Sequence, residues 1–208
     1  MTKSFCFLVF LFFVSNFSFG QILPEDQIRE VYKNYSGAIS VCDGKEAIKY
    51  LDSRSANYYN RILKFVKTAD SVTISTMSLV DKSTVLLFRN MLTKEELKSF
   101  EGLSLMAYLI DRKLGGRALL LSDLVVNGDS ATGHIIGSGG QTTPQYPLFY
   151  KENDEWKIDI TALFPISEPY MKKMVDKNFS GNENAFCLMV AGASNRKIPG
   201  REIWQPME

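Results

Sequence analysis

The chain has 208 residues, of which 24 are basic (Lys or Arg) and 23 acidic, with 1 His, 3 Cys and 45% hydrophobic residues. This balance argues against a nucleic-acid-binding protein, which needs a basic face to displace phosphate counterions, and against an acidic disordered tail. A chain of this size buries one sizeable core, so a single domain is expected.

The first 20 residues differ from the rest in composition. They hold 7 of the 14 Phe, one basic residue (Lys3) and no acidic residue, and residues 5–14 are apolar throughout. Ten residues rise about 15 Å as a helix, roughly half the thickness of a membrane's hydrocarbon core. Residues 1–20 are therefore predicted to be a signal peptide, cleaved near Gly20, with export to the periplasm or the medium. No second apolar run of 18 residues follows, so we expect a soluble mature chain without a membrane span.

Cys42 and Cys187 remain after removal of the signal. Export permits a disulfide between them, and closing so long a loop would constrain the unfolded chain by roughly 4–5 kcal/mol in the entropy model. The alternative is two separate buried thiols, since both stand among apolar residues at helical spacing. Neither has a CxxC partner or a nearby His, which argues against zinc and thiol-redox chemistry.

Hydrophobic periodicity predicts helices in the first half of the mature chain. Apolar residues spaced by three and four run from Pro24, a residue suited to a first helical turn, to Cys42. After a break at Asp43-Gly44 and a short helical turn, a second long helix is expected to bury a stripe between Tyr58 and Val66.

The next segments are predicted from alternation, length and capping. Residues 71–76 alternate apolar and polar side chains, which favours a short strand. Residues 79–92 fit a buried strand or a helix, and their length favours the helix. Thr93 and Glu96 form a capping box, which predicts a further helix interrupted at Gly102.

The second half changes to a strand period. Short turns, including Asn127-Gly128 and Asn153-Asp154, cannot host parallel crossovers, so an antiparallel meander is expected. Beyond the meander, Ser167 is expected to cap a helix, and the chain ends in a further apolar helical turn and a tail. The four predicted strands are residues 117–126, 130–137, 145–151 and 155–161.

Amphipathic helices followed by an antiparallel sheet give an α+β domain with the helices on one sheet face. The last hairpin, from Phe149 to Ile160, reads aromatic-aromatic-Lys-Glu-turn-Glu-Trp-Lys-Ile-Asp-Ile. This hairpin and the element order over residues 23–161 resemble the nuclear transport factor 2-like superfamily. The resemblance implies N-terminal helices packed in a curved antiparallel sheet, a cone with an internal cavity, over residues 21–177. A C-terminal helical extension and tail would occupy residues 178–208.

Two residues are candidates for acid–base chemistry. Asp159 lies on the strand face opposite Trp156 and Ile158, so it is expected to point outward, paired or solvated. Its alternative role is a catalytic base with a pKa raised by desolvation in an apolar cone. His134, the only histidine, is expected to be a partly exposed strand residue, with a place near the cavity mouth as the alternative. No clustered acids, bases or metal ligands accompany them, and neither a metal site nor a cofactor is predicted.

The leading functional hypothesis is non-catalytic binding of a small apolar ligand or a protein partner through the cone and its sheet. The alternative is a cofactor-independent isomerase, dehydratase or hydrolase that uses Asp159 and His134. A third class, a purely structural protein, would have no cavity of roughly 300 Å³ or more. The resemblance further implies a homodimer formed through the sheet. Aromatic residues are expected to line the ligand cavity: Tyr32, Tyr35, Tyr59, Tyr108, Tyr146 and Trp156.

Overall fold

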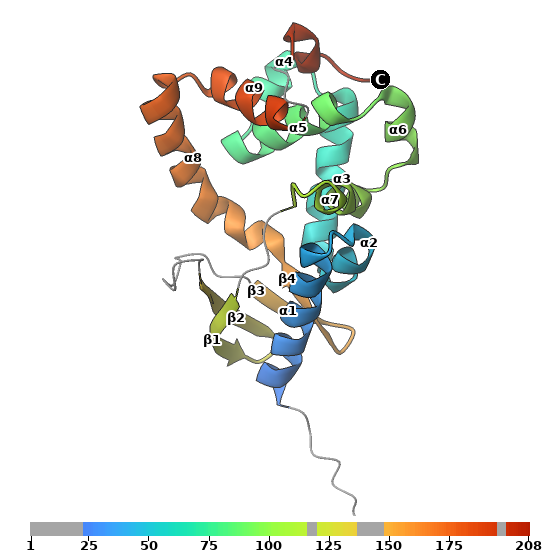
Figure 1. The fold of residues 1–208 in the computed structure, drawn as a ribbon, viewed down its shortest axis with the longest axis vertical. Coiled ribbons are helices and arrows are strands. Elements are labelled where there is room, and N and C mark those ends of the chain that lie inside the picture. Colours follow the sequence, from blue (N-terminus) through green and yellow to red (C-terminus); the bar gives the residue numbers. More distant parts are fainter. Residues whose placement is uncertain (1–22, 116–119, 137–147, 195–198) are drawn as a thin grey trace, which may run out of the picture.

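The computed structural model describes residues 23–115, 120–136, 148–194 and 199–208. These residues form an α+β fold, as predicted, with a four-stranded sheet towards one end of the molecule and most of the helices beyond it (Figure 1). The predicted signal peptide, residues 1–20, lies outside the described residues, as does Tyr146. The strands are β1 (Leu120–Asn127), β2 (Ser130–Ile136), β3 (Leu148–Glu152) and β4 (Glu155–Asp159). The helices are α1 (Pro24–Ser40), α2 (Gly44–Ala47), α3 (Ser53–Thr68), α4 (Ser71–Ser75), α5 (Leu79–Met91), α6 (Lys94–Ser99), α7 (Gly102–Asp111), α8 (Phe164–Phe179) and α9 (Glu183–Ala193), with 3-10 turns η1 (Ile48–Tyr50), η2 (Ile160–Leu163) and η3 (Arg201–Trp204).

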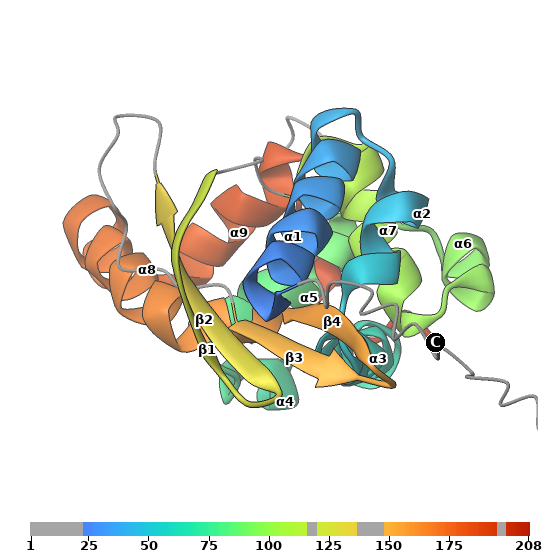
Figure 2. The same cartoon turned by 90° about the horizontal axis from the view of Figure 1, so that it is seen from below.

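The sheet is the predicted antiparallel meander, with strand order β1-β2-β3-β4. Ala131, Phe149 and Ile158 are paired across three strands and are all buried, so they define the core face of the sheet. Helix α1 lies across this face (Figure 2), where the ring of Tyr32 meets Phe149 edge-on with the centroids 6.2 Å apart. The core face is therefore covered by α1, as expected, whereas Arg54 in the first turn of α3 stacks on Tyr150 of the opposite face.

Both two-residue turns of the meander follow from local conformation. Asn153 and Asp154 both have positive φ, as a type I′ hairpin requires. In the first hairpin Asn127 still pairs with Ser130, so the loop is Gly128-Asp129, one residue later than predicted. Positive φ there falls on Gly128 alone, at 58°, which suits the first position of a type II′ turn.

Helix α3 connects the sheet with a mainly helical part of the molecule (Figure 1). At its start the amide of Asp52 donates to the carbonyl of Ile158 over 3.0 Å, next to a parallel bridge between Leu51 and Ile158. This contact extends the sheet edge at β4 by a short extended segment. The N-terminal turn of α3 is thereby fixed beside the end of β4.

The C-terminal segment packs onto the helical part and is not a free tail. Helix α9 lies along α5, where the Asn90 side chain donates to the carbonyl of Ala191 over 2.8 Å. Arg89 is buried and donates to four backbone carbonyls, of Phe65, Val66, Ala69 and Ile203. Because three of these belong to the end of α3 and one to η3, a single guanidinium ties the chain terminus to the helix it covers.

The strand predicted over residues 71–76 is wrong, because this segment forms the helix α4. The Asp70 carboxylate accepts from the amide of Thr73 over 2.8 Å and so caps the helix. Of the two apolar residues in the alternating pattern, only Ile74 is buried, and Val72 is exposed. The alternation therefore does not correspond to a buried strand face. Local capping therefore outweighed β-propensity.

Two further boundaries differ from the prediction. Helix α8 begins at Phe164 and contains Ser167, whose hydroxyl donates to the carbonyl of Leu163, so Ser167 is not its cap. The last strand ends at Asp159, where the chain turns into η2. The interruption at Gly102 is confirmed as a break between α6 and α7, and the capping box at Thr93 is formed.

Cys42 and Cys187 are both free thiols in the described part of the chain. Cys187 is fully buried, with its sulfur 3.3 Å from the hydroxyl of Ser83, whereas Cys42 is partly exposed at the end of α1. Of the two alternatives left open by the sequence, separate thiols are observed. Over the described ranges, no helix has the length and apolar character needed to cross a membrane.

Candidate functional site

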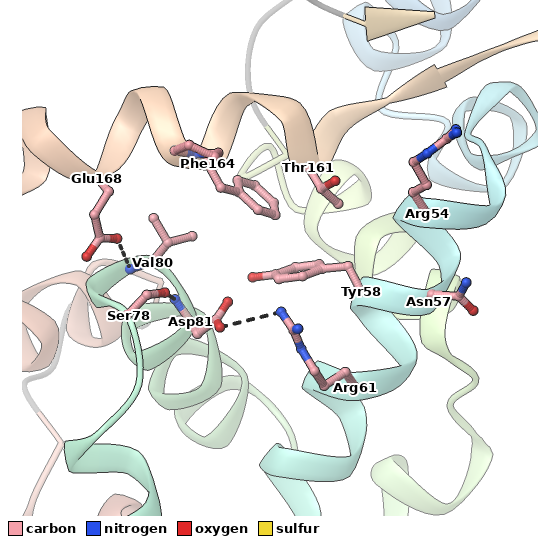
Figure 3. A pocket seen from close by; sticks show the side chains of 11 residues that line it. Arg54, Asn57, Tyr58, Arg61, Ser78, Val80, Asp81, Thr161, Phe164 and Glu168 are labelled. Carbon is pink, nitrogen blue, oxygen red and sulfur yellow. Dashed lines mark hydrogen bonds and ion pairs between the residues drawn. The ribbon is translucent and has the colours of Figure 1, made fainter. Parts of the chain in front are cut away.

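A pocket of about 750 Å³ opens between α3, the N-terminal end of α5 and the segment that leads from η2 into α8 (Figure 3). Its volume is in the range of small-molecule sites, roughly 300–1,000 Å³. The lining mixes charged, polar, aromatic and aliphatic side chains from segments far apart in the sequence: Arg54, Asn57, Tyr58, Arg61, Ser78, Val80, Asp81, Thr161, Phe164, Pro165 and Glu168.

One wall of the pocket is a stripe along α3. Arg54, Asn57, Tyr58 and Arg61 recur at spacings of three and four, which places them on one face of a helix. The helix is started by Asp52, whose carboxylate accepts from the amide of Ser55 over 2.8 Å. From the sequence, this helix was expected to have a buried apolar stripe and a solvated outer face, so the site was missed. The helical spacing of these four residues is the signal that could have indicated it.

Tyr58 lies at the centre of the pocket, and only 7% of the residue is exposed. Its ring packs against Tyr59 at 5.2 Å and Phe164 at 4.6 Å between centroids. Among the described residues no partner satisfies the hydrogen-bonding requirement of its buried hydroxyl. Burial raises the pKa of Tyr58, and the Asp81 carboxylate raises it further, so the hydroxyl remains a neutral donor at physiological pH.

Arg54 is held rigidly at the rim of the pocket. Its guanidinium donates to the Asp52 carboxylate over 2.9 Å, lies 3.9 Å from Glu152, and stacks 3.4 Å above the centre of the Tyr150 ring. Side-chain hydrogen bonding with Asp52 raises the pKa of Arg54. The charge of Arg54 is therefore compensated by these acids, and its position is fixed.

Arg61 is held more loosely. Its one ion pair among the described residues is with Asp81 across the pocket, with 3.5 Å between nitrogen and oxygen, and 55% of its side chain is exposed. The Asp81 side chain is 20% exposed, and the guanidinium of Arg61 lies 5.4 Å from the centre of the Tyr58 ring. An exposed pair of this geometry contributes little to stability, about 0–1 kcal/mol, so both partners can change contacts at small cost.

The opposite wall is fixed by Glu168. Its two carboxylate oxygens accept from the amides of Leu79, over 2.9 Å, and Val80, over 3.1 Å, at the start of α5. Ser78 caps the same helix by accepting from the amide of Asp81. Glu168 therefore docks α8 onto α5 and occupies the amides that would otherwise attract an anionic ligand.

Asp159 was expected to be paired or solvated, and it is paired, with only 5% of the residue exposed. Its carboxylate accepts from both the amide and the hydroxyl of Thr161, at 2.9 and 2.5 Å. Arg54, in the first turn of α3, stacks on Tyr150 of the same sheet face and interacts electrostatically with Asp159, which the strand pattern alone could not reveal. Asp159 holds Thr161, which lines the pocket, while Asp159 itself does not line it.

His134 and Asp159 share the outer sheet face but do not meet. Asp159 pairs with Leu148, which pairs with Thr132, so the two candidates are two strands apart and offset by two residues. At about 4.8 Å per strand this separation is roughly 10 Å or more between the backbones. The structure therefore does not bring the two acid–base candidates into one site.

The aromatic residues predicted to line a ligand cavity are distributed over several places. Tyr32, Tyr35, Tyr59 and Trp156 are buried; Tyr59 donates to the sulfur of Met106 over 3.1 Å. Burial raises the pKa values of Tyr32, Tyr35 and Tyr59. Tyr108 is half-buried against Phe100, and its hydroxyl donates to the carbonyl of Met91. None of these five lines the 750 Å³ pocket, whereas Tyr58 does. Tyr146 lies outside the described residues.

Within the described ranges, no group of three or more His, Cys, Asp or Glu side chains is arranged to hold a metal ion. In comparisons with known proteins, no family model matches the chain and no curated protein is significantly similar to it. The functional argument therefore depends on the chemistry of the pocket.

Proposed function

We propose that this chain is a binding domain that holds a small, partly apolar molecule in the pocket between α3, α5 and α8. The observation that carries the proposal is the Tyr58 hydroxyl, which is buried at the pocket without a hydrogen-bond partner among the described residues. A buried unsatisfied hydroxyl costs about 1–3 kcal/mol, and a ligand acceptor group would recover that energy.

The rest of the lining supports binding better than catalysis. Phe164, Pro165 and Val80 offer an apolar surface, and two of the charged groups around it, Glu168 and Arg54, are engaged in positioning contacts. Among the described residues that line the pocket, the Asp81 carboxylate lies near Tyr58, and the two acid–base candidates from the sequence, Asp159 and His134, do not line it. The pocket chemistry therefore supports recognition by shape, by one neutral hydrogen-bond donor and by polar groups at the rim.

The binding proposal is tested with the purified full chain. Small molecules that co-purify are identified by mass spectrometry, and a metabolite library is screened by thermal shift, with Tyr58→Phe and Tyr170→Phe measured beside the wild type. Tyr170 is an exposed tyrosine of α8 that does not line the pocket, so it is the matched control. We expect a stabilising ligand whose effect is reduced in Tyr58→Phe and retained in Tyr170→Phe. Equal ligand shifts in all three proteins would exclude this pocket.

We also propose that residues 1–20 direct export, on the basis of their apolar, Phe-rich composition and the small residues before Gln21. Intact-mass measurement of the protein recovered from the periplasm or medium tests this, since cleavage would leave a chain that begins at Gln21. Recovery of the uncleaved chain in the cytoplasm alone would contradict it.

We further propose that the sheet and α1 form a nuclear transport factor 2-like cone. The support is the aromatic-Lys-Glu-turn-Trp-Lys-Ile-Asp hairpin and the position of α1 on the core face of the sheet (Figure 2). The expected homodimer would use the outer sheet face, where Val125 of β1 is 68% exposed. A monomeric mass in light scattering at high protein concentration would exclude the dimer.

A further inference from the structure

The positive and negative side chains of the pocket lie on opposite walls. Arg54 and Arg61 project from α3, while Asp81 of α5 and Glu168 of α8 stand on the other side (Figure 3). The lining as a whole is formally neutral, with two cations facing two anions. A neutral pocket with oppositely charged walls favours a ligand that is itself neutral overall and carries opposite charges at two ends.

From this arrangement we propose that the pocket binds an amino-acid-like zwitterion with an apolar side chain. This inference rests on the proposed binding function and names its ligand class. The ligand carboxylate would pair with the exposed guanidinium of Arg61, and the ligand ammonium with the Asp81 carboxylate. The ligand thereby exchanges the loose 3.5 Å pair between these two residues for two pairs of its own.

The choice of Arg61 and Asp81 follows from how the other two charges are used. Arg54 is bound to Asp52 and stacked on Tyr150, and Glu168 is occupied by two backbone amides. Arg61 and Asp81 make a loose 3.5 Å ion pair beside the Tyr58 ring, and within the described part of the chain they are the pocket charges held least tightly, so they are the ones able to receive a ligand.

The neutral parts of the pocket fit the same ligand. Tyr58, kept protonated by burial, donates a hydrogen bond and therefore needs an acceptor such as a carboxylate oxygen. Phe164 packs on the Tyr58 ring and supplies an aromatic surface for the apolar side chain. A ligand with only a negative charge would be repelled by the Asp81 carboxylate, and a ligand with only a positive charge would be repelled by the Arg61 guanidinium.

The test uses three probes that share a phenyl group and differ in charge: phenylalanine, 3-phenylpropanoate and phenethylamine. Binding to the full chain is measured by calorimetry or ligand-observed NMR at concentrations up to about 10 mM, which detects millimolar affinities. We expect phenylalanine to bind about tenfold more tightly than either probe with a single charge, as the loss of one charged hydrogen bond predicts.

Two variants assign the charges. Asp81→Asn is expected to remove the preference for phenylalanine over 3-phenylpropanoate, and Arg61→Gln the preference over phenethylamine. Lys64→Gln, an exposed residue one turn further along α3, is the control and should change neither ratio. Circular dichroism and unfolding curves establish that each variant is folded before its ratio is compared.

The outcomes separate this inference from the function on which it rests. Three results would overturn the proposal of a zwitterionic ligand. They are equal binding of phenylalanine and a singly charged probe, affinity ratios that are unchanged in both variants, and no detectable binding of phenylalanine. The binding function survives each of these results if the library screen finds a ligand whose thermal shift depends on Tyr58. It fails separately if no ligand depends on Tyr58.

Discussion

Replacing Tyr58 by Phe should make the unliganded protein more stable, which is the reverse of the usual effect of losing a tyrosine hydroxyl. The hydroxyl is buried, and among the described residues it makes no hydrogen bond of normal geometry, although Thr84 and the Asp81 carboxylate lie near it, so the water it lost on folding is not fully replaced. The ring contacts with Tyr59 and Phe164 do not involve the oxygen and should persist in the variant.

The magnitude follows from two opposing contributions. Removing an unsatisfied buried hydroxyl relieves about 1–3 kcal/mol of desolvation, and the small void left by one oxygen atom costs up to about 1 kcal/mol. We therefore expect the free energy of unfolding to rise by about 1 kcal/mol, or the melting temperature by about 2–4 °C for a chain of this length.

Urea titration measures the change in the free energy of unfolding, on protein dialysed to remove bound ligand. Tyr170→Phe, at an exposed tyrosine, is the control. The same Tyr58→Phe variant should bind the pocket ligand more weakly, so stability and affinity move in opposite directions. A loss of 1 kcal/mol or more in the unliganded Tyr58→Phe protein would refute the reasoning, because it would mean that the hydroxyl is already satisfied.

Three other predictions concern the scaffold. Arg89→Met should lower the free energy of unfolding by about 3 kcal/mol or more in urea titration, because four backbone carbonyls lose the guanidinium as a donor, of which that of Phe65 keeps the Ala69 amide as a second donor. Gly102→Ala should destabilise the protein by about 1–3 kcal/mol, since a Cβ there would lie 2.3 Å from a side-chain oxygen of α3. Gly37→Ala is the control: it has open space around it and should stabilise the helix slightly. Equal effects of the two substitutions would contradict this packing. Cys42 should react with a thiol reagent in the native protein, whereas Cys187, whose pKa is raised by burial and which therefore carries less thiolate at any given pH, should react only after unfolding; native reaction of both thiols would contradict its burial.

The elements that could be predicted from the sequence are those with a complete local signal. Pro24 opens α1, Thr93 and Glu96 form their capping box, and the Asn153-Asp154 turn closes the last hairpin. Each signal lies within four residues, so its physical cause is present in the sequence itself. The antiparallel pairing of β1 with β2 and of β3 with β4 then follows, because two-residue turns leave only antiparallel neighbours.

The elements that could not be predicted depend on contacts between distant segments. Asp159 is buried and interacts electrostatically with Arg54 of the first turn of α3, more than 100 residues earlier in the chain. The strand predicted at residues 71–76 failed because a single Asp70 cap outweighed a short alternating pattern. Periodicity describes which face a side chain takes, and it does not tell what covers that face.

The candidate site divides in the same way. The stripe formed by Arg54, Tyr58 and Arg61 could be read from its helical spacing, but its meaning depended on Asp81 and Phe164, which reach it from α5 and α8. An isolated polar stripe on a helix is ordinarily a solvated surface. Only the packing of the other two segments converts it into the wall of a pocket.

Three polar contacts fix the walls of this pocket independently of any ligand. Asp52 holds Arg54 at the rim, Asp159 holds Thr161 at the turn into α8, and Glu168 holds α8 against the first amides of α5. Because each contact joins a different wall to the scaffold, the cavity is preorganised, and binding needs little ordering of the protein. The groups left to respond are Arg61 and Asp81, so discrimination between ligands should depend on these two residues while the other polar contacts maintain the shape.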